Sequence, residues 1–177
     1  MSIHRYDKHS VRADLRRAAM GLILTVGPML LLGDSAMALA ILGALALLFL
    51  AFGLRTALRG MTLVHVTEHG LSSDPLGGRG GRLPGLAPRT IAWRDIRKVG
   101  LRFFSLKRDR SEGWMELSLG DGRQGLRLDS TLDGFKDIVV RAAGAARANN
   151  VSLSDSTQAN LAALGIRVGG GHGGDAA

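Results

Sequence analysis

The sequence predicts an α+β protein: an N-terminal transmembrane α-helical hairpin, then an antiparallel β-barrel capped by a C-terminal amphipathic helix. Three observations lead to this prediction. A long apolar run at 18–54 is broken once near its middle, short alternating runs recur between 60 and 130, and one apolar stripe of helical period follows them. The hairpin therefore precedes the strands, and a packed helix ends the domain.

The apolar run is too long for one membrane helix. Residues 18–54 contain no Lys, Arg or Glu. As a single helix they would extend about 55 Å, whereas the hydrocarbon core of a bilayer is about 30 Å thick. The segment 33–35, Gly-Asp-Ser, interrupts the run, and its Asp34 belongs at a membrane surface because a charge at the bilayer centre is costly. We expect two transmembrane helices, at 18–32 and 36–54, joined by a tight turn at 33–35.

Basic residues flank the apolar run on both sides. Five lie in the basic N-terminal segment 1–17, and Arg55 and Arg59 follow the run, whereas the turn carries only an aspartate. The positive-inside bias predicts a multi-pass protein with both termini in the cytoplasm. The alternative is a signal peptide with its basic region at Arg16 and Arg17 and cleavage after Ala38, which would leave the second apolar segment as an anchor.

Small residues recur along the second apolar segment. Ala36, Ala40 and Ala44 stand four positions apart, a spacing that lets two helix backbones approach closely. We expect this stripe to pack against the first helix of the same chain. A contact between two copies of the chain is the alternative.

The basic charge points to a membrane surface. Of the formal net charge of +8, residues 1–59 carry +4, from seven basic and three acidic residues, and the remainder carries +4, from sixteen and twelve. Half the excess thus flanks the membrane segment, which favours attraction to anionic lipid over nucleic acid. Aromatic residues, which nucleic-acid-binding surfaces use for stacking, make up only 5% of the chain. The absence of cysteine excludes disulfides and thiolate metal sites.

After residue 60 the apolar period changes to two. Gly-Asp-Gly at 120–122 is a hairpin turn signal. A long loop rich in Gly and Arg is expected at 75–89, and a charged loop is expected at 107–112. The alternating runs predict strands at 61–67, 71–74, 90–93, 99–103, 115–119 and 126–128.

A helix follows these strands and completes a domain at 60–150. Ser130 and Asp133 resemble a capping box, and Asn149 with its asparagine neighbour ends the helix. Its apolar stripe consists of Leu132, Phe135, Ile138, Val139, Ala142 and Ala146. The segment 151–166 predicts a short C-terminal helix, capped by Ser154 and ended by Gly165, and the Gly-rich tail 167–177 is expected to be disordered.

Four segments carry a family resemblance. They read V-T-E-H-G-L at 66–71, T-I-A-W-R-D-I at 90–96, L-S-L-G-D-G at 117–122 and L-D-S-T-L-D-G-F at 128–135. Together with the order of short strands and one amphipathic helix, they make the chain resemble bacterial pleckstrin-homology-like (PH-like) domains of small membrane proteins. The resemblance implies a PH-like barrel beside one or two helices in a bacterial inner membrane. It brings no catalytic residue with it.

The sequence offers no constellation for catalysis. It lacks a phosphate-binding loop and a nucleophile elbow. His65 and His69 lie on a strand and a turn, where a spacing of four does not bring two side chains together. Asp121 is explained by a turn and Asp133 by a cap. We therefore expect a protein that is not an enzyme and has no cofactor and no metal.

The two tryptophans differ in their expected surroundings. Trp93, between two isoleucines, is expected in the core with its N–H bonded to a partner. Trp114 follows the charged loop, and two environments remain open for it. One is the core, and the other is a surface contact that includes insertion at a membrane interface.

The basic loops are the candidate contacts for lipid or for a protein partner. Their residues are Arg79, Arg82, Lys107, Arg108 and Arg110. PH-like barrels can hold phosphorylated headgroups with such loops, so the resemblance implies this role, and solvated loops without a ligand are the alternative.

The predicted function is a membrane-tethered, non-enzymatic binding or scaffolding module at the cytoplasmic face. Its expected partners are the lipid bilayer and its anionic headgroups, or a membrane protein, with no nucleic acid. A structural or regulatory subunit of a membrane complex, including a homo-oligomer, is the alternative.

Overall fold

The chain divides into two compact units. The structure is a computed structural model, and it describes residues 1–31, 35–77, 87–106 and 113–166. The sheet unit comprises Met1–His4, Val64–Ser73 and Pro88–Ala177, and the hairpin unit comprises Arg5–Leu63 and Asp74–Ala87. In sequence, the hairpin unit is thus inserted into the sheet unit.

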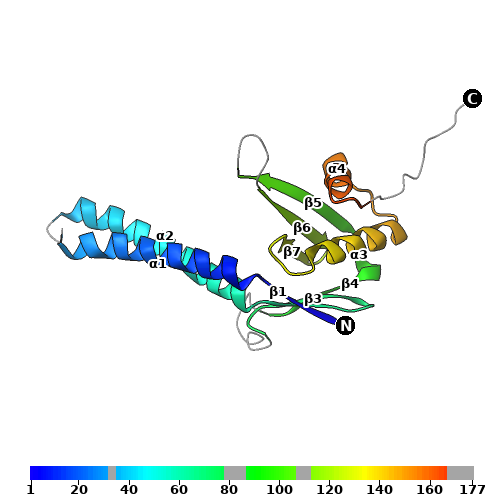
Figure 1. Cartoon of the computed structure of the whole chain (residues 1–177), viewed down its shortest axis with the longest axis horizontal. Helices are drawn as coiled ribbons and strands as arrows, with labels where there is room; N and C mark the ends of the chain where they lie inside the picture. The colour runs from blue at the N-terminus through cyan, green and yellow to red at the C-terminus, as the bar shows by residue number, and fades with distance from the viewer. Residues whose placement is uncertain (32–34, 78–86, 107–112, 167–177) are drawn as a thin grey trace, which may run out of the picture. The chain divides into compact units, whose positions relative to one another are not determined.

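Most of the predicted elements are present. The sheet unit and its borders carry the strands β1 Ser2–Arg5, β2 Leu63–Val66, β3 Gly70–Asp74, β4 Arg89–Ala92, β5 Lys98–Ser105, β6 Gly113–Gly120 and β7 Gly125–Asp129. The helices are α1 Lys8–Leu31, α2 Ala36–Met61, the 3-10 turn η1 Trp93–Asp95, α3 Phe135–Ala148 and α4 Asp155–Ala163 (Figure 1).

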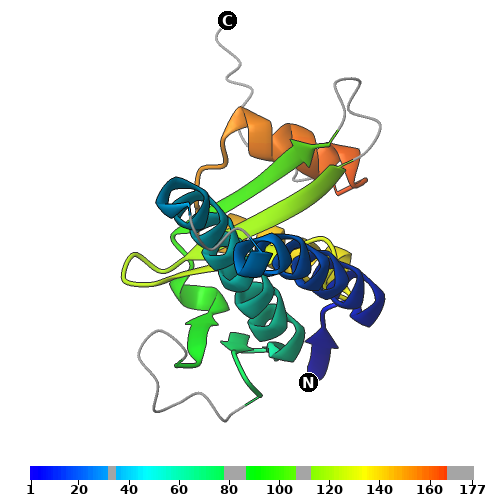
Figure 2. The same cartoon turned by 90° about the vertical axis from the view of Figure 1, so that its left-hand side faces the viewer.

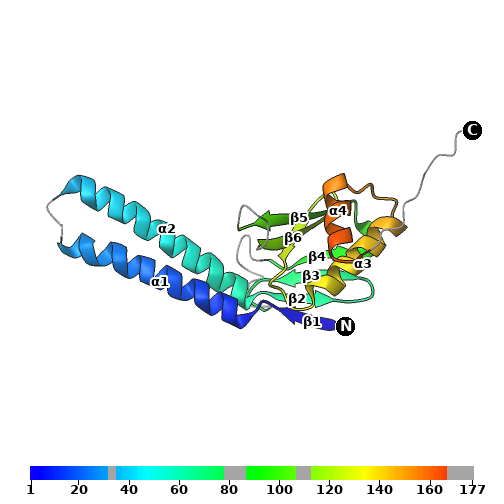
Figure 3. The ribbon, with the colours of Figure 1, turned by 45° about the horizontal axis from the view of Figure 1, so that its top comes forward.

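The strands form two sheets and not a barrel. The first sheet has the strand order β1-β2-β3-β4 (Figure 3), and the second, separate sheet has the order β5-β6-β7 (Figure 1). Side chains, and not a strand ladder, bridge the two: Gln124 Nε2 donates to Thr90 O at 2.6 Å, and Arg89 donates to Gly125 O at 3.2 Å. Among the described residues no barrel closes, which corrects the predicted PH-like barrel.

β1 is the strand that the sequence pattern missed. The segment 1–17, predicted as a basic N-terminal segment, contains β1 and the first turns of α1. β1 lies next to β2, so the helical hairpin connects two neighbouring strands of one sheet. A Cβ on Gly134 would overlap the ring of His4, which shows that β1 also contacts the turn before α3.

Both hairpin helices extend beyond the apolar run. α1 begins at Lys8, where the Asp7 carboxylate accepts hydrogen bonds from the backbone N–H groups of His9 (3.1 Å) and Ser10 (2.9 Å). α2 continues to Met61, past the predicted end at 54. Ser35 caps α2 by accepting from the Ala38 N–H at 3.4 Å, and the rest of the predicted turn lies outside the described residues, which omit 32–34.

Alternation and register build the core of the sheet unit. Leu101 pairs with Leu117, which pairs with Leu128, and all three are almost completely buried. Every residue of the predicted apolar stripe is buried, and all of them except Leu132, which precedes the helix, lie on α3. The predicted hairpin turn is also confirmed. The Asp121 carboxylate accepts hydrogen bonds from the backbone N–H groups of Arg123 and Gln124, and Gly122 has φ 92°.

The predicted capping box at the start of α3 is wrong. Ser130 Oγ accepts instead from the Met115 N–H of β6 at 3.0 Å, and Gly134, in the left-handed region at φ 64°, precedes the helix without a side-chain cap. A tertiary hydrogen bond thus outcompetes the local one. The predicted end at Asn149 is confirmed, and its side chain donates to Trp93 O (2.7 Å) and Ile96 O (3.1 Å).

α4 covers the outer edge of β5 (Figure 2). Thr157 Oγ1 accepts from the Leu101 N–H at 3.3 Å, and Asn160 Nδ2 donates to Leu101 O at 2.7 Å. The cap by Ser154 and the end before Gly165 are confirmed. Because an open strand edge invites pairing with another chain, α4 protects the centre of β5 from such pairing.

Candidate functional site

The distal part of the helical hairpin exposes an unusual amount of apolar surface. Its exposed side chains are Met20, Ile23, Leu24, Val26, Leu30 and Leu31 of α1, and Met37, Ile41, Leu45, Leu47, Leu48, Leu50, Phe52 and Leu54 of α2. Soluble proteins rarely expose continuous apolar patches beyond a few hundred Å². Exposed apolar surface of this kind is typical of sites that contact a membrane or another protein.

Among the described helices, α2 alone is long and apolar enough to cross a membrane. α1 does not meet that criterion, because its first ten residues include Lys8, Arg12, Arg16 and Arg17. The hairpin is therefore present as predicted, whereas a two-span topology remains a proposal.

Small residues let α1 and α2 pack closely. A Cβ on Gly53 would lie 3.3 Å from Ala18 Cβ, one on Gly60 would lie 2.8 Å from Val11, and one on Gly21 would overlap the Phe49 ring. These pairs fix the antiparallel register of the helices. The residues at this contact recur every three or four positions. On α1 they are Ala18, Gly21 and Thr25, which are buried, and on α2 they are Gly53, Thr56 and Gly60.

The predicted alanine stripe is not part of this contact. Ala36, Ala40 and Ala44 are all exposed. With 3.6 residues per turn, Ala40 lies half a turn around the helix from Phe49, which faces α1. The packing expected between the stripe and the first helix is therefore made by other residues, and the stripe faces outward from the hairpin.

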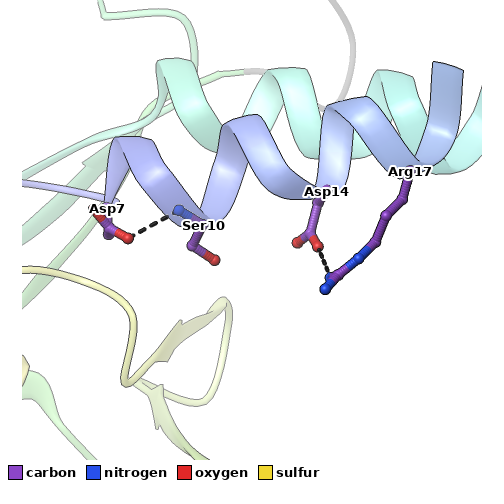
Figure 4. Close-up of polar contacts among 4 residues, drawn as sticks. All are labelled: Asp7, Ser10, Asp14 and Arg17. Atoms are coloured by element: carbon purple, nitrogen blue, oxygen red, sulfur yellow. Dashed lines mark hydrogen bonds and ion pairs between the residues drawn. The ribbon is translucent and has the colours of Figure 1, made fainter. Parts of the chain in front are cut away.

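Six basic residues form a basic belt on the two helices, toward the ends that lie away from the turn. We use this name for Lys8, Arg12, Arg16, Arg17, Arg55 and Arg59, which the register brings to neighbouring levels of the two helices. The Arg17 guanidinium reaches back along α1 and donates to Asp14 at 2.8 Å (Figure 4). The Asp7 carboxylate caps α1, and the N–H groups of Ser10 and His9 hold its pKa below the ordinary 3.8.

One arginine of the belt is anchored on an aromatic ring. The Arg59 guanidinium carbon lies 4.9 Å from the centroid of the Tyr6 ring, and Tyr6 is only 8% exposed. A guanidinium at this distance from a ring face is attracted by its quadrupole. The pair ties the end of α2 to the segment that enters α1.

A cleft of about 520 Å³ opens at the base of the hairpin, within the hairpin unit. Its lining includes the basic residues Arg5 and Lys8 and the apolar residues Met61, Leu63 and Leu76. Leu76 has φ 66°, a left-handed conformation that is strained for a bulky residue. The lining of the cleft is thus amphipathic.

The predicted basic loops lie outside the described residues. Arg79 and Arg82 fall within 78–86, and Lys107, Arg108 and Arg110 fall within 107–112. They remain predicted contacts.

The two tryptophans have different surroundings. The indole N–H of Trp93 donates to Thr67 O at 3.0 Å, so the expected partner is present, but Trp93 is half-buried in η1 and not in the core as predicted. Trp114 lies at the surface, 40% exposed, with its ring 5.1 Å from that of Phe104.

Sequence reasoning missed the cleft and the true packing face of the hairpin. The three glycines of that face at 21, 53 and 60 were a usable signal, because each matches a close approach to the partner helix. The cleft had no such signal, since segments far apart in the sequence build it.

No protein-family model, curated protein or solved structure significantly matches the chain.

Proposed function

We propose that the chain is a membrane-anchored, non-enzymatic binding or scaffolding module. In this proposal α1 and α2 cross the bilayer together, and the sheet unit lies at the cytoplasmic face. The exposed apolar residues of the distal hairpin would contact lipid chains, and the basic belt would lie among anionic headgroups.

One observation carries the proposal: β1 and β2 are neighbours in one sheet. β1 precedes α1 and β2 follows α2, so the chain must enter and leave the hairpin on the same side of any membrane. A lone crossing by α2 would separate the two strands and leave their backbone groups unpaired. If α2 crosses, the segment that contains α1 must therefore cross as well.

The lengths of the helices agree with such a hairpin. At about 1.5 Å per residue, a hydrocarbon core of about 30 Å takes about 20 residues of each helix. Measured from the turn, its edge then lies near Asp14 on α1 and near Arg55 on α2. Arg17 lies inside this edge, and its guanidinium reaches back to Asp14, as expected of an arginine that snorkels toward the surface.

The positive-inside bias supports the cytoplasmic placement of the sheet unit. The basic belt lies on the side of the hairpin from which both chain ends emerge, and the sequence of the turn at 33–35 contains no basic residue. On this side the belt, together with the predicted contacts Arg79, Arg82, Lys107, Arg108 and Arg110, would face the anionic leaflet.

Single-cysteine labelling tests the topology, because the chain contains no cysteine of its own. The variants Ser2→Cys, Ala36→Cys and Ser152→Cys are treated with a membrane-impermeant maleimide in intact cells and after permeabilisation. We expect Ala36→Cys to react in intact cells and the other two only after permeabilisation.

Two outcomes would contradict the proposal. Labelling of Ser2→Cys but not Ser152→Cys in intact cells would indicate a single crossing. Protection of all three until permeabilisation would indicate no crossing.

The intact mass of the purified chain also tests the signal-peptide alternative, because cleavage after Ala38 would remove β1.

A second candidate function, a subunit of a membrane complex, is favoured by the outward position of Ala36, Ala40 and Ala44. A stripe of small residues facing away from α1 is open to a helix of another chain. We expect crosslinking in the membrane to capture one partner, which is lost with Ala40→Leu and kept with the control Met37→Leu. A crosslink between identical chains would identify a homo-oligomer, and equal crosslinking in both variants would exclude the stripe.

A further inference from the structure

We propose that the cleft at the base of the hairpin binds the phosphate headgroup of an anionic phospholipid. Arg5 and Lys8 would hold the phosphate, and the apolar residues Met61, Leu63 and Leu76 would contact the CH2 groups of the glycerol that carries it. This inference rests on the proposed function, because it places the cleft at the membrane surface.

The cations of the cleft are available to a ligand. Arg5 and Lys8 are exposed, and among the described residues neither has a carboxylate within 4.0 Å. The nearest acidic residue in sequence, Asp7, is engaged with the backbone N–H groups of His9 and Ser10. Guanidinium and ammonium groups without an internal partner form strong charge-assisted hydrogen bonds with phosphate oxygens.

The apolar residues of the lining argue for a phospholipid headgroup and against a free anion. Met61 is 49% exposed, and Leu63 and Leu76, which line the same cleft, are half-buried. A free phosphate would use the cations and leave these apolar side chains in water. A phospholipid headgroup carries its phosphate on a glycerol, so a cleft of about 520 Å³ could hold the phosphate beside the basic residues and the CH2 groups beside the apolar ones.

The backbone of the cleft supports a built site. Leu76 and Gly77 both have positive φ, at 66° and 55°. A bulky residue in the left-handed region is strained, and such residues concentrate at ligand sites. Gly77 is also in close contact with Leu63, since an added Cβ would lie 3.3 Å from its Cδ1.

The level of the cleft matches that of the headgroups. With the hydrocarbon edge near Asp14 and Arg55, Lys8 lies six residues and Gly60 five residues further along the helices. These steps correspond to about 9 and 8 Å along the axes. Headgroups occupy about 5 to 8 Å beyond the hydrocarbon, so the cleft lies at their outer level, where phosphate is within reach of long cationic side chains.

Native mass spectrometry of the full chain in a neutral detergent tests the site. The probes are dioctanoyl phosphatidylglycerol, dioctanoyl phosphatidylcholine and inorganic phosphate. We expect one phosphatidylglycerol to bind at least ten times more tightly than phosphatidylcholine, and the double variant Arg5→Gln/Lys8→Gln to weaken it at least tenfold. Lys8→Arg should retain binding because it keeps the cation.

The matched control is Arg94→Gln/Arg123→Gln, which removes the same charge from exposed positions of the sheet unit. It should leave binding unchanged. Three results would overturn the inference: equal loss in both double variants, equal binding of the two lipids, or displacement of phosphatidylglycerol by an equal concentration of inorganic phosphate, which would identify a free-anion site.

A carbonate wash of proteoliposomes separates this inference from the proposed function. Arg5→Gln/Lys8→Gln should stay in the membrane pellet like the wild type, because the apolar hairpin and not the cleft would anchor the chain. Release of the wild-type chain would overturn the membrane proposal and, with it, the placement of the cleft. Retention with no lipid preference in detergent would overturn the headgroup site alone.

Discussion

At the scale of single residues, tertiary hydrogen bonds decided positions that local patterns left open. Ser130 has the sequence context of a helix cap, yet its hydroxyl accepts from Met115 across the sheet. Asn149 ends α3 as predicted, but its side chain also donates to the carbonyls of Trp93, the first residue of η1, and of Ile96, which follows η1. The same residue thus stops a helix and holds a distant turn.

We expect Asn149→Ala to lower the free energy of unfolding by about 1–3 kcal/mol, because Trp93 O and Ile96 O lose their donor. Denaturant unfolding of the full chain in detergent, followed by near-UV circular dichroism, measures the loss. Asn150→Gly is the control, since Asn150 has φ 54°, which glycine adopts without strain. Equal effects of the two substitutions would argue against this role of Asn149.

At the scale of elements, the hairpin shows how small residues select a packing face. Alanines at spacing four predicted one face of α2, but the contact with α1 uses Gly53 and Gly60 on the opposite side. Glycine permits a closer approach than alanine, and the large Phe49 fills the space over Gly21. Spacing alone could not separate the two faces, because both carry small residues.

We expect Gly21→Ala to destabilise the hairpin by about 1–3 kcal/mol, since the new methyl group would overlap the Phe49 ring. Gly27→Ala, in the same helix, should be neutral or better, because nothing lies within 4 Å of its added Cβ. Thermal unfolding of the full chain in detergent compares them. Phe49→Leu should recover much of the loss, and failure to do so would place the Gly21 effect elsewhere.

At the scale of the whole molecule, the pairing of β1 with β2 constrains everything between them. It brings the two ends of the hairpin back to one sheet, so that in the proposed membrane topology the hairpin would cross an even number of times. It also means that a fragment beginning at residue 60 lacks one strand of the sheet unit. Experiments on this protein therefore require the full chain.

We expect deletion of residues 1–5 to lower the melting temperature and to promote association, because it exposes the β2 edge and removes His4 from Gly134. Size-exclusion chromatography and thermal unfolding in detergent measure both effects. Ile3→Ser is the control, since the Ile3 side chain is 54% exposed. A deleted chain as stable and monodisperse as the control would show that β1 contributes little to the sheet unit.

The sequence by itself determined the elements whose signals are local. Period-two runs located β2 to β7, the stripe from Phe135 to Ala146 located α3, and the apolar run with its break located the hairpin. The tertiary structure alone decided β1, the two-sheet arrangement and the amphipathic cleft. β1 is too short and polar to signal a strand and exists because β2 offers an edge, and the cleft joins segments that only folding brings together.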